Sequence, residues 1–241
     1  MHVVETRDGP RTSPAAGGAE TLATSLYDRI RKEVLSGKLE PGRKLQIDFL
    51  CERYGAGQTP LREALNRLTS DGLVERHEQR GFAVTPVSRD DLIEITKTRC
   101  WLEEVALRES LANRTAAWEE ALVLAHHRLG RTARSTSTEG YEEDPQWASL
   151  HAAFHHALIG GCQSRWLIVF CEQLADQLYR YRQLAVRLSY PNRHEWEEHQ
   201  AILDAVLKGD ADEAVRHLTA HYRETADIIL ADERLFGRPA A

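Results

Sequence analysis

Four histidines have positions that could bind a metal ion. His151 and His155 are four residues apart, so on a helix both imidazoles project from one face and could hold one divalent ion. His199 and His221 fall on the last two predicted helices, where neighbouring helices of a bundle converge. The alternative is that the four are ordinary structural histidines. Residue type alone leaves both interpretations open.

A second group of polar residues could contact DNA from one predicted helix. Its members are Gln58, Thr59, Arg62, Asn66 and Arg67. Arg62 and Asn66 are one turn apart and share a face, where arginine suits a two-point contact with guanine and asparagine with adenine. Arg76 and Arg80 follow in a predicted hairpin, within reach of a flanking minor groove or phosphate. On an ordinary amphipathic helix the same residues would only form a solvated face.

The elements that must position these candidate DNA contacts form a short, recognisable order. Apolar residues recur with helical spacing in three stretches, at residues 24–36, 47–54 and 59–71. Thr59 is the expected N-cap of the third helix. Beyond Gly72 the pattern changes to that of a small hairpin over residues 73–85. Three helices and a hairpin wing predict a winged helix-turn-helix, whose second paired helix enters the major groove.

The rest of the chain is predicted to be all helical, so the fold class is mainly α. The expected helices span residues 89–112, 115–131, 144–160, 164–188, 193–208 and 211–232. About six helices of this length, separated by short breaks, predict an antiparallel bundle. The expected divisions are a flexible tail at 1–20, a DNA-binding domain at 21–87, a helical sensing domain at 88–232 and a tail at 233–241.

Composition limits the class of protein. With 42% hydrophobic and 28% charged residues the chain can bury a sizeable core, and no apolar run is long enough to span a membrane. We therefore expect a cytoplasmic protein, whose four scattered cysteines are reduced and part of the core. The net charge of −6 argues against nucleic acid binding, but the acidic excess lies in residues 87–241, whereas residues 22–86 are slightly basic.

Several sequence segments in the first domain closely resemble those of one protein family. They are Gly37 to Gly42, Thr59 to Leu65, Asp71 to Val74 and Arg80 to Val84, and in order and spacing they resemble the DNA-binding domain of the GntR family of bacterial regulators. That family usually has Ser-Arg before Thr-Pro, where this chain has Gly57-Gln58. This departure predicts a different operator sequence, with binding retained.

Residues 88–232 resemble FCD, the C-terminal sensing domain of the FadR subfamily. The resemblance implies a metal, commonly together with a small organic acid, and it favours metal binding by the four histidines. The family commonly has Asp at the position of His151. An all-imidazole set favours Zn, Ni or Cu over Mn or Mg, so we expect a divalent ion, Zn or Ni first. His151 could instead lie beside the ion, leaving a three-histidine site with open positions.

Arg99 is the candidate that would bind the acid. Guanidinium pairs with carboxylate through two hydrogen bonds, so Arg99 could clamp an effector. The alternative is a salt bridge with Glu103 on the next turn. The run Arg180, Tyr181 and Arg182 on a later helix could also face the pocket, but its periodicity does not say which residue does.

These predictions together describe a sequence-specific transcriptional regulator, expected to be a repressor and not an enzyme. Its partners would be double-stranded operator DNA, a small carboxylate effector and a second copy of the chain in a homodimer. One alternative is a regulator for which the metal is itself the signal. Another is a Zn-dependent hydrolase fused to a DNA-binding domain, although the sequence has no placed general base and no H-E-x-x-H motif.

Overall fold

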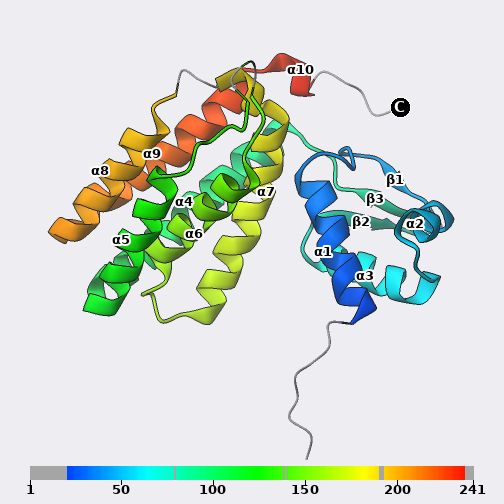
Figure 1. Cartoon of the computed structure of the whole chain (residues 1–241), viewed down its shortest axis with the longest axis horizontal. Helices are drawn as coiled ribbons and strands as arrows, with labels where there is room; N and C mark the ends of the chain where they lie inside the picture. Colours follow the sequence, from blue (N-terminus) through cyan, green and yellow to red (C-terminus); the bar gives the residue numbers. More distant parts are fainter. Residues whose placement is uncertain (1–20, 79, 138, 140, 190–192, 237–241) are drawn as a thin grey trace, which may run out of the picture.

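The N-terminal part of the computed structural model contains three helices and three short strands (Figure 1). The structure describes residues 21–78, 80–137, 139, 141–189 and 193–236, so the expected tail at 1–20 lies outside it. The elements are α1 (Leu22–Leu35), β1 (Lys44–Leu45), α2 (Ile47–Tyr54), α3 (Gln58–Ser70), β2 (Val74–His77) and β3 (Gly81–Val84). The winged helix-turn-helix prediction is confirmed.

The apolar faces of α1 and α3 form the core of this part. Leu26 and Ile30 of α1 and Leu61 and Leu65 of α3 are completely buried, as the helical spacing of these residues predicts. One detail of the prediction was wrong. The third helix begins at Gln58 with Gly57 as its N-cap, so Thr59 lies inside the first turn and does not cap it.

The wing is a three-stranded antiparallel sheet, with strand order β1-β3-β2, where the sequence predicted only a hairpin. Leu45 of β1 pairs with Phe82, and Val74 of β2 pairs with Val84. The strand β1 has two residues, which is too short for an alternating pattern to show in the sequence. It is held by the burial of Leu45 against the helices.

Six long helices form the second part, as far as the structure describes it, and confirm the predicted bundle. They are α4 (Arg89–Ala112), α5 (Ala116–Gly130), α6 (Pro145–Ile159), α7 (Arg165–Ser189), α8 (Glu195–Lys208) and α9 (Ala211–Leu230). A short helix, α10 (Glu233–Phe236), stands where a tail was expected, because Leu235 and Phe236 pack against a buried cluster that includes Ile229. The last five residues of the expected tail, 237–241, lie outside the described part of the chain.

Within the bundle, α4 lies against α7 and α9, α8 packs on α9, and α5 packs on α6 (Figure 1). The central core includes Phe154, Leu158, Ile202, Leu218 and Tyr222, all buried. Where the chain is described, no helix combines the length and the apolar character needed to cross a membrane.

Helix α7 of the bundle contacts α1 of the winged domain (Figure 1). Gln177 donates a hydrogen bond to the backbone oxygen of Asp71 at 2.9 Å, and buried Arg180 donates to the backbone oxygen of Thr85. The Tyr181 hydroxyl donates to Asp91 Oδ2 at 2.6 Å, just beyond the linker. One helix of the bundle therefore fixes both the end of the recognition helix and the end of the wing.

Candidate metal centre and nucleic-acid interface

The four candidate histidines meet inside the helical bundle. His151 and His155 come from α6, His199 from α8 and His221 from α9, and one ring nitrogen of each lies within 4.8 Å of those of the other three. His155, His199 and His221 are buried, and His151 is partly buried. The i,i+4 spacing on α6 places two rings on one face, as predicted, and the packing of α8 on α9 brings the other two to them.

The environment keeps these imidazoles neutral. Burial lowers the pKa of His151, His155 and His199 well below 6.5, and neighbouring imidazoles and arginines lower it further. The pKa of His221 is lowered by burial too, although Glu198 acts in the opposite direction. Neutral imidazole is the form that binds a metal ion, so the cluster is in the state that a metal site requires.

Hydrogen bonds between Nδ1 and an oxygen atom orient the rings of His221 and His155. Glu198 Oε2 lies 2.6 Å from His221 Nδ1, and the Tyr222 hydroxyl lies 2.9 Å from His155 Nδ1. Burial would raise the pKa of Glu198, but hydrogen bonds with His221 and Arg193 lower it to about 2. The ionised Glu198 therefore accepts the Nδ1 proton of His221 and leaves Nε2 with the lone pair. Outer partners of this kind are typical of metal-binding histidines.

His199 provides the test of whether the residues fit a metal ion. Its Nε2 is buried and has no hydrogen-bond partner among the described residues. A buried polar atom without a partner costs about 1–3 kcal/mol. A divalent ion would give this atom a partner, and an all-imidazole donor set suits Zn or Ni. The side chains therefore fit a divalent ion.

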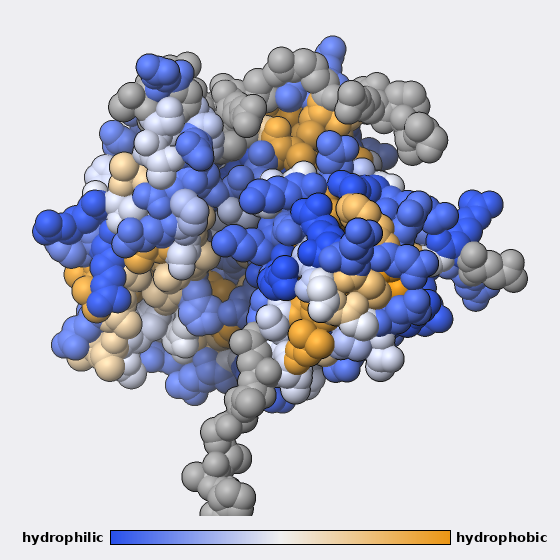
Figure 2. All heavy atoms as spheres, turned by 45° about the vertical axis from the view of Figure 1, so that its right-hand side comes forward, coloured by the Kyte–Doolittle hydropathy of each residue, from blue (hydrophilic) through white to orange (hydrophobic). Residues whose placement is uncertain are grey.

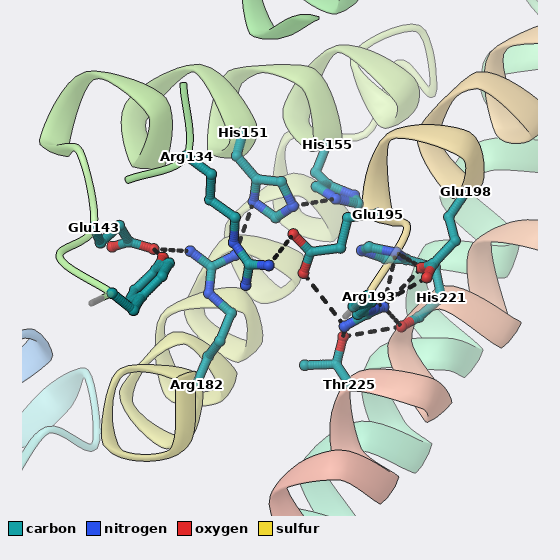
Figure 3. Close-up of polar contacts among 11 residues, drawn as sticks. Arg134, Glu143, His151, His155, Arg182, Arg193, Glu195, Glu198, His221 and Thr225 are labelled. Atoms are coloured by element: carbon teal, nitrogen blue, oxygen red, sulfur yellow. Dashed lines mark hydrogen bonds and ion pairs between the residues drawn. The ribbon is translucent and has the colours of Figure 1, made fainter. Parts of the chain in front are cut away.

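Arginines surround the histidine cluster (Figure 3). Arg182 of α7 lies 3.3 Å from His151 Nδ1 and pairs with Glu143 at 2.7 Å. Arg193, just before α8, contacts the backbone oxygen of His221 at 3.0 Å and pairs with Glu198 at 2.7 Å. The four rings are neutral and the arginines are paired with glutamates, so a bound divalent ion would itself supply the positive charge that attracts an anion.

The structure places Arg99 in the salt bridge and not in the histidine cluster. Its Nε lies 2.6 Å from Glu103 Oε1, both side chains are buried, and its guanidinium lies 3.9 Å from the centre of the Tyr222 ring. Of the run on α7, Arg182 faces the histidines. Arg180 instead contacts the backbone oxygen of Thr85 after the wing, and Tyr181 contacts Asp91 in the first turn of α4. Arg180 and Arg182 are two positions apart, so their side chains project from nearly opposite sides of α7 and contact different domains.

The candidate DNA contacts lie on the outer side of the winged domain. Thr59, Arg62 and Asn66 are exposed on α3, and Arg76 and Arg80 are exposed on the wing. Hydrophilic residues predominate on the face that includes this domain, with small apolar areas between them (Figure 2). Leu61 and Leu65 lie on the buried side of α3, so the side that carries Arg62 and Asn66 faces solvent.

Two of the residues predicted to contact DNA, Gln58 and Arg67, are exposed but already bind other side chains of the same chain. Gln58 Nε2 donates to Asp48 Oδ1 of α2 at 3.0 Å. Arg67 lies over the ring of Tyr27 at 4.2 Å and donates to Thr24 Oγ1 at 3.2 Å. Arg67 is therefore on the side of α3 that faces α1, apart from Arg62 and Asn66.

Comparison with known families accounts for nearly all of this architecture. The model described as bacterial regulatory proteins, gntR family, matches residues 22–84, and the FCD domain model matches residues 94–224. The chain belongs to the GntR family. Its C-terminal part is the FadR-type sensing domain, so the resemblance seen in the sequence is confirmed.

Individual relatives agree with the GntR assignment. The chain is 35% identical to the HTH-type transcriptional regulator BphR of Paraburkholderia xenovorans, covering 87% of this chain and 85% of that protein. It is 29% identical to the HTH-type transcriptional repressor GlaR of Escherichia coli, over 86% and 96% of the two chains. The structure of E. coli McbR/YncC shares the fold, with a TM-score of 0.70, 23% identity and coverage of 88% and 98%. The domains and relatives are transcriptional regulators, so this GntR protein is a DNA-binding regulator and not an enzyme.

Sequence reasoning missed several residues of the centre. They are Glu143, Arg193, Glu198 and Tyr222. One signal was available, because Glu198 and Tyr222 each stand next to a candidate histidine in the chain. Glu143 gave none, since it lies in the α5–α6 connection and reaches Arg182, 39 residues away.

Proposed function

We propose that this GntR regulator controls its operator through a divalent ion and a small organic acid bound in the FCD domain. The supporting observation is the convergence of four neutral imidazoles around the buried, unpartnered Nε2 of His199. His155, His199 and His221 would hold the ion, with His151 as a fourth ligand or a close neighbour. The ion would supply Lewis-acid attraction for a carboxylate.

Charge favours an anionic effector at this centre. A divalent ion on four neutral imidazoles keeps its full positive charge, and Arg182 and Arg193 offer N–H donors beside it. The carboxylates of Glu143 and Glu198 are already paired with these arginines. A small carboxylic acid could therefore bind the open metal positions, with Arg182 as a nearer partner than Arg99.

Helix α7 offers a physical path from the centre to DNA. Arg182 touches His151 on one side of α7, while Gln177 and Arg180 hold the winged domain on the other. An effector changes operator affinity only if it binds one arrangement of the domains better than the other. A shift of α7 at Arg182 would move the contacts to Asp71 and Thr85, which end the recognition helix and the wing.

We further propose that the protein is a homodimeric repressor that contacts its operator with Arg62 and Asn66. Thr59, Arg76 and Arg80 would contact the same site, while Gln58 would have to leave Asp48 to reach a base. The relative named as a repressor, GlaR, supports the direction of control. Action on chromosomal DNA would place the protein in the cytoplasm.

The deciding experiment measures metal content and thermal stability of wild type and His199→Ala. Wild type should hold stoichiometric Zn or Ni and melt at a higher temperature with metal, because a ligand of the folded state stabilises it. His199→Ala should lose both properties. His156→Ala is the matched control, since His156 is an exposed residue of the same cluster-bearing helix α6. Metal-free wild type without stabilisation by added Zn or Ni would refute the proposal.

Operator binding then separates the two kinds of signal. Gel shifts with metal, with chelator and with metal plus a small dicarboxylate such as malonate compare the three states. A change with the dicarboxylate supports an organic-acid effector. A change with metal alone supports the alternative in which the ion itself is the signal.

A further inference from the structure

A continuous chain of buried and part-buried hydrogen bonds runs through the histidine cluster, and it fixes which ring nitrogen carries each proton. It passes from Arg182 to His151 (3.3 Å), from His151 to His155 (3.2 Å), and from His155 to Tyr222 (2.9 Å). The Tyr222 hydroxyl then reaches Glu103, which pairs with Arg99. The contacts of His151 with Arg182 and with His155 can be followed in Figure 3.

The Arg182 end sets the direction at His151. Guanidinium has only donors, and His151 Nδ1, unlike His221 Nδ1, has no carboxylate against it among the described residues. Arg182 Nη1 therefore donates and His151 Nδ1 accepts. A neutral imidazole has one N–H, which leaves the proton of His151 on Nε2. That Nε2 lies 3.2 Å from Nε2 of His155 and points its proton at it.

The opposite end requires the same direction independently. Arg99 holds Glu103 as a buried carboxylate, which can only accept. The Tyr222 hydroxyl therefore donates to Glu103 Oε2, and its oxygen accepts the Nδ1 proton of His155. Nε2 of His155 is then the lone-pair atom, which is the partner that the proton of His151 needs.

We infer that His151 is not a fourth metal ligand but a hydrogen-bond donor, held in the Nε2–H form by Arg182, that recognises an oxygen of the bound anion. This inference rests on the proposed function, because it assumes the ion on His155, His199 and His221. Once the lone pair of His155 is taken by the ion, the Nε2 proton of His151 needs another acceptor. A carboxylate oxygen at the centre supplies it.

The arrangement defines the class of effector. The donors that face the centre would be His151 Nε2–H and the guanidinium of Arg182. Trp147 stacks on the His151 ring with centroids 4.8 Å apart, and Arg182 lies over the same indole at 5.3 Å, so both donors are held in place. The site is therefore built for an anion with several acceptor oxygens, and against ligands that offer only N–H groups. A carboxylate at position 151 could not supply this N–H donor.

Proton positions can be read directly from the metal-free protein. Long-range ¹H–¹⁵N NMR spectra of protein labelled at histidine nitrogen separate the two neutral tautomers, and loss of one signal in His151→Gln assigns the residue. We expect His151 in the Nε2–H form and His155 in the Nδ1–H form. Observation of His151 in the Nδ1–H form would overturn the inference without reference to any metal.

Metal content and anion binding test the donor role. His151→Leu and His151→Gln should both retain stoichiometric Zn or Ni, whereas His199→Ala should lose it. Calorimetry with malonate as the probe should show affinity at least about tenfold weaker in His151→Leu, because a hydrogen bond to a charged group is lost. His151→Gln keeps an N–H donor of similar reach and should restore most of it.

The outcomes separate this inference from the proposed function. Wild type that holds no metal refutes both. If wild type binds the metal but His151→Leu and His151→Gln do not, His151 is a metal ligand. That result overturns the inference and leaves the proposed function standing. Equal malonate binding by metal-loaded wild type and His151→Leu also overturns it.

Discussion

Arg62 is the residue on which sequence-specific binding is expected to depend most. It is exposed near the start of α3, one turn from Asn66, and its neighbours Leu61 and Leu65 are buried. Arg62→Ala should weaken operator binding by ~1–3 kcal/mol with unchanged helical content, because no core contact is lost. Gel-shift titration measures the operator affinity, and circular dichroism measures the helical content. Arg128→Ala, an exposed arginine on α5, is the control and should bind as wild type does.

Gln58 is the position where this chain departs from the commoner family residue. Gln58→Arg should change the bases preferred near the centre of each half-site, since arginine favours guanine where glutamine favours adenine. The new cation would also stand beside Asp48, the present partner of Gln58. Selection from a random operator library measures the preference. An unchanged profile would show that residue 58 does not read a base.

The buried histidines should make the metal-free protein sensitive to acid. Burial lowers their pKa in the folded state, so below pH 6.5 the unfolded chain takes up protons that the folded protein does not. Stability is therefore complete above pH 6.5 and falls as the pH drops below it. Melting temperatures in chelator between about pH 8 and pH 5 should show this decline.

The matched control for the acid sensitivity is His194→Gln. His194 is exposed, and its replacement should leave the pH dependence unchanged. His155→Asn removes one buried imidazole and should make the decline shallower. A melting temperature of wild type that stays constant through this range would contradict the prediction.

At the scale of elements, α7 belongs to the helical bundle and also contacts the winged domain. Arg180 is buried between them and donates to Gln177 at 2.7 Å as well as to the backbone oxygen of Thr85. Arg180→Ala should leave Thr85 without this partner and uncouple the domains, so that operator affinities with Zn and with chelator become nearly equal. Metal content should stay normal, because Arg180 does not face the histidines.

The control for Arg180 lies on the same helix. Arg165 is exposed at the first position of α7, and Arg165→Ala should keep the full response of operator affinity to metal. If Arg180→Ala responds to metal as strongly as Arg165→Ala does, α7 does not carry the signal through this contact.

At the scale of the whole molecule, one chain presents only one recognition helix, so a pseudo-palindromic operator requires two copies. Ile93, Trp101 and Val105 are each about half exposed and follow one side of α4, with exposed fractions of 50%, 57% and 51%. Light scattering should give the mass of two chains for wild type, and Trp101→Glu should shift the protein toward monomer.

Trp166→Glu is the comparison for the dimer, because Trp166 is also an exposed tryptophan but belongs to α7 and not to α4. It should remain dimeric. Wild type that is monomeric even on operator DNA would refute the dimer, and a dimeric Trp101→Glu would move the interface elsewhere.

The sequence determined the elements of this protein and the identity of its main candidate residues. Helix bounds in the bundle follow from apolar spacing and from caps such as Ser88 and Asp210, whose side chains accept the backbone N–H three residues on. The i,i+4 pair on α6 predicts its own geometry, because a helix fixes the relation of residues one turn apart. Winged domain and bundle were predictable for this local reason.

Only the tertiary structure decided what each side chain contacts. Arg99 could pair with Glu103 or with a ligand, and in the structure it pairs with Glu103 beside Tyr222. Arg182 meets Glu143 and His151 only because α7 packs beside the α5–α6 connection and α6. Contacts between residues far apart in the chain depend on how helices rotate and pack, and no local period encodes that. The same holds for the proton positions along the hydrogen-bond chain, which both of its ends set together.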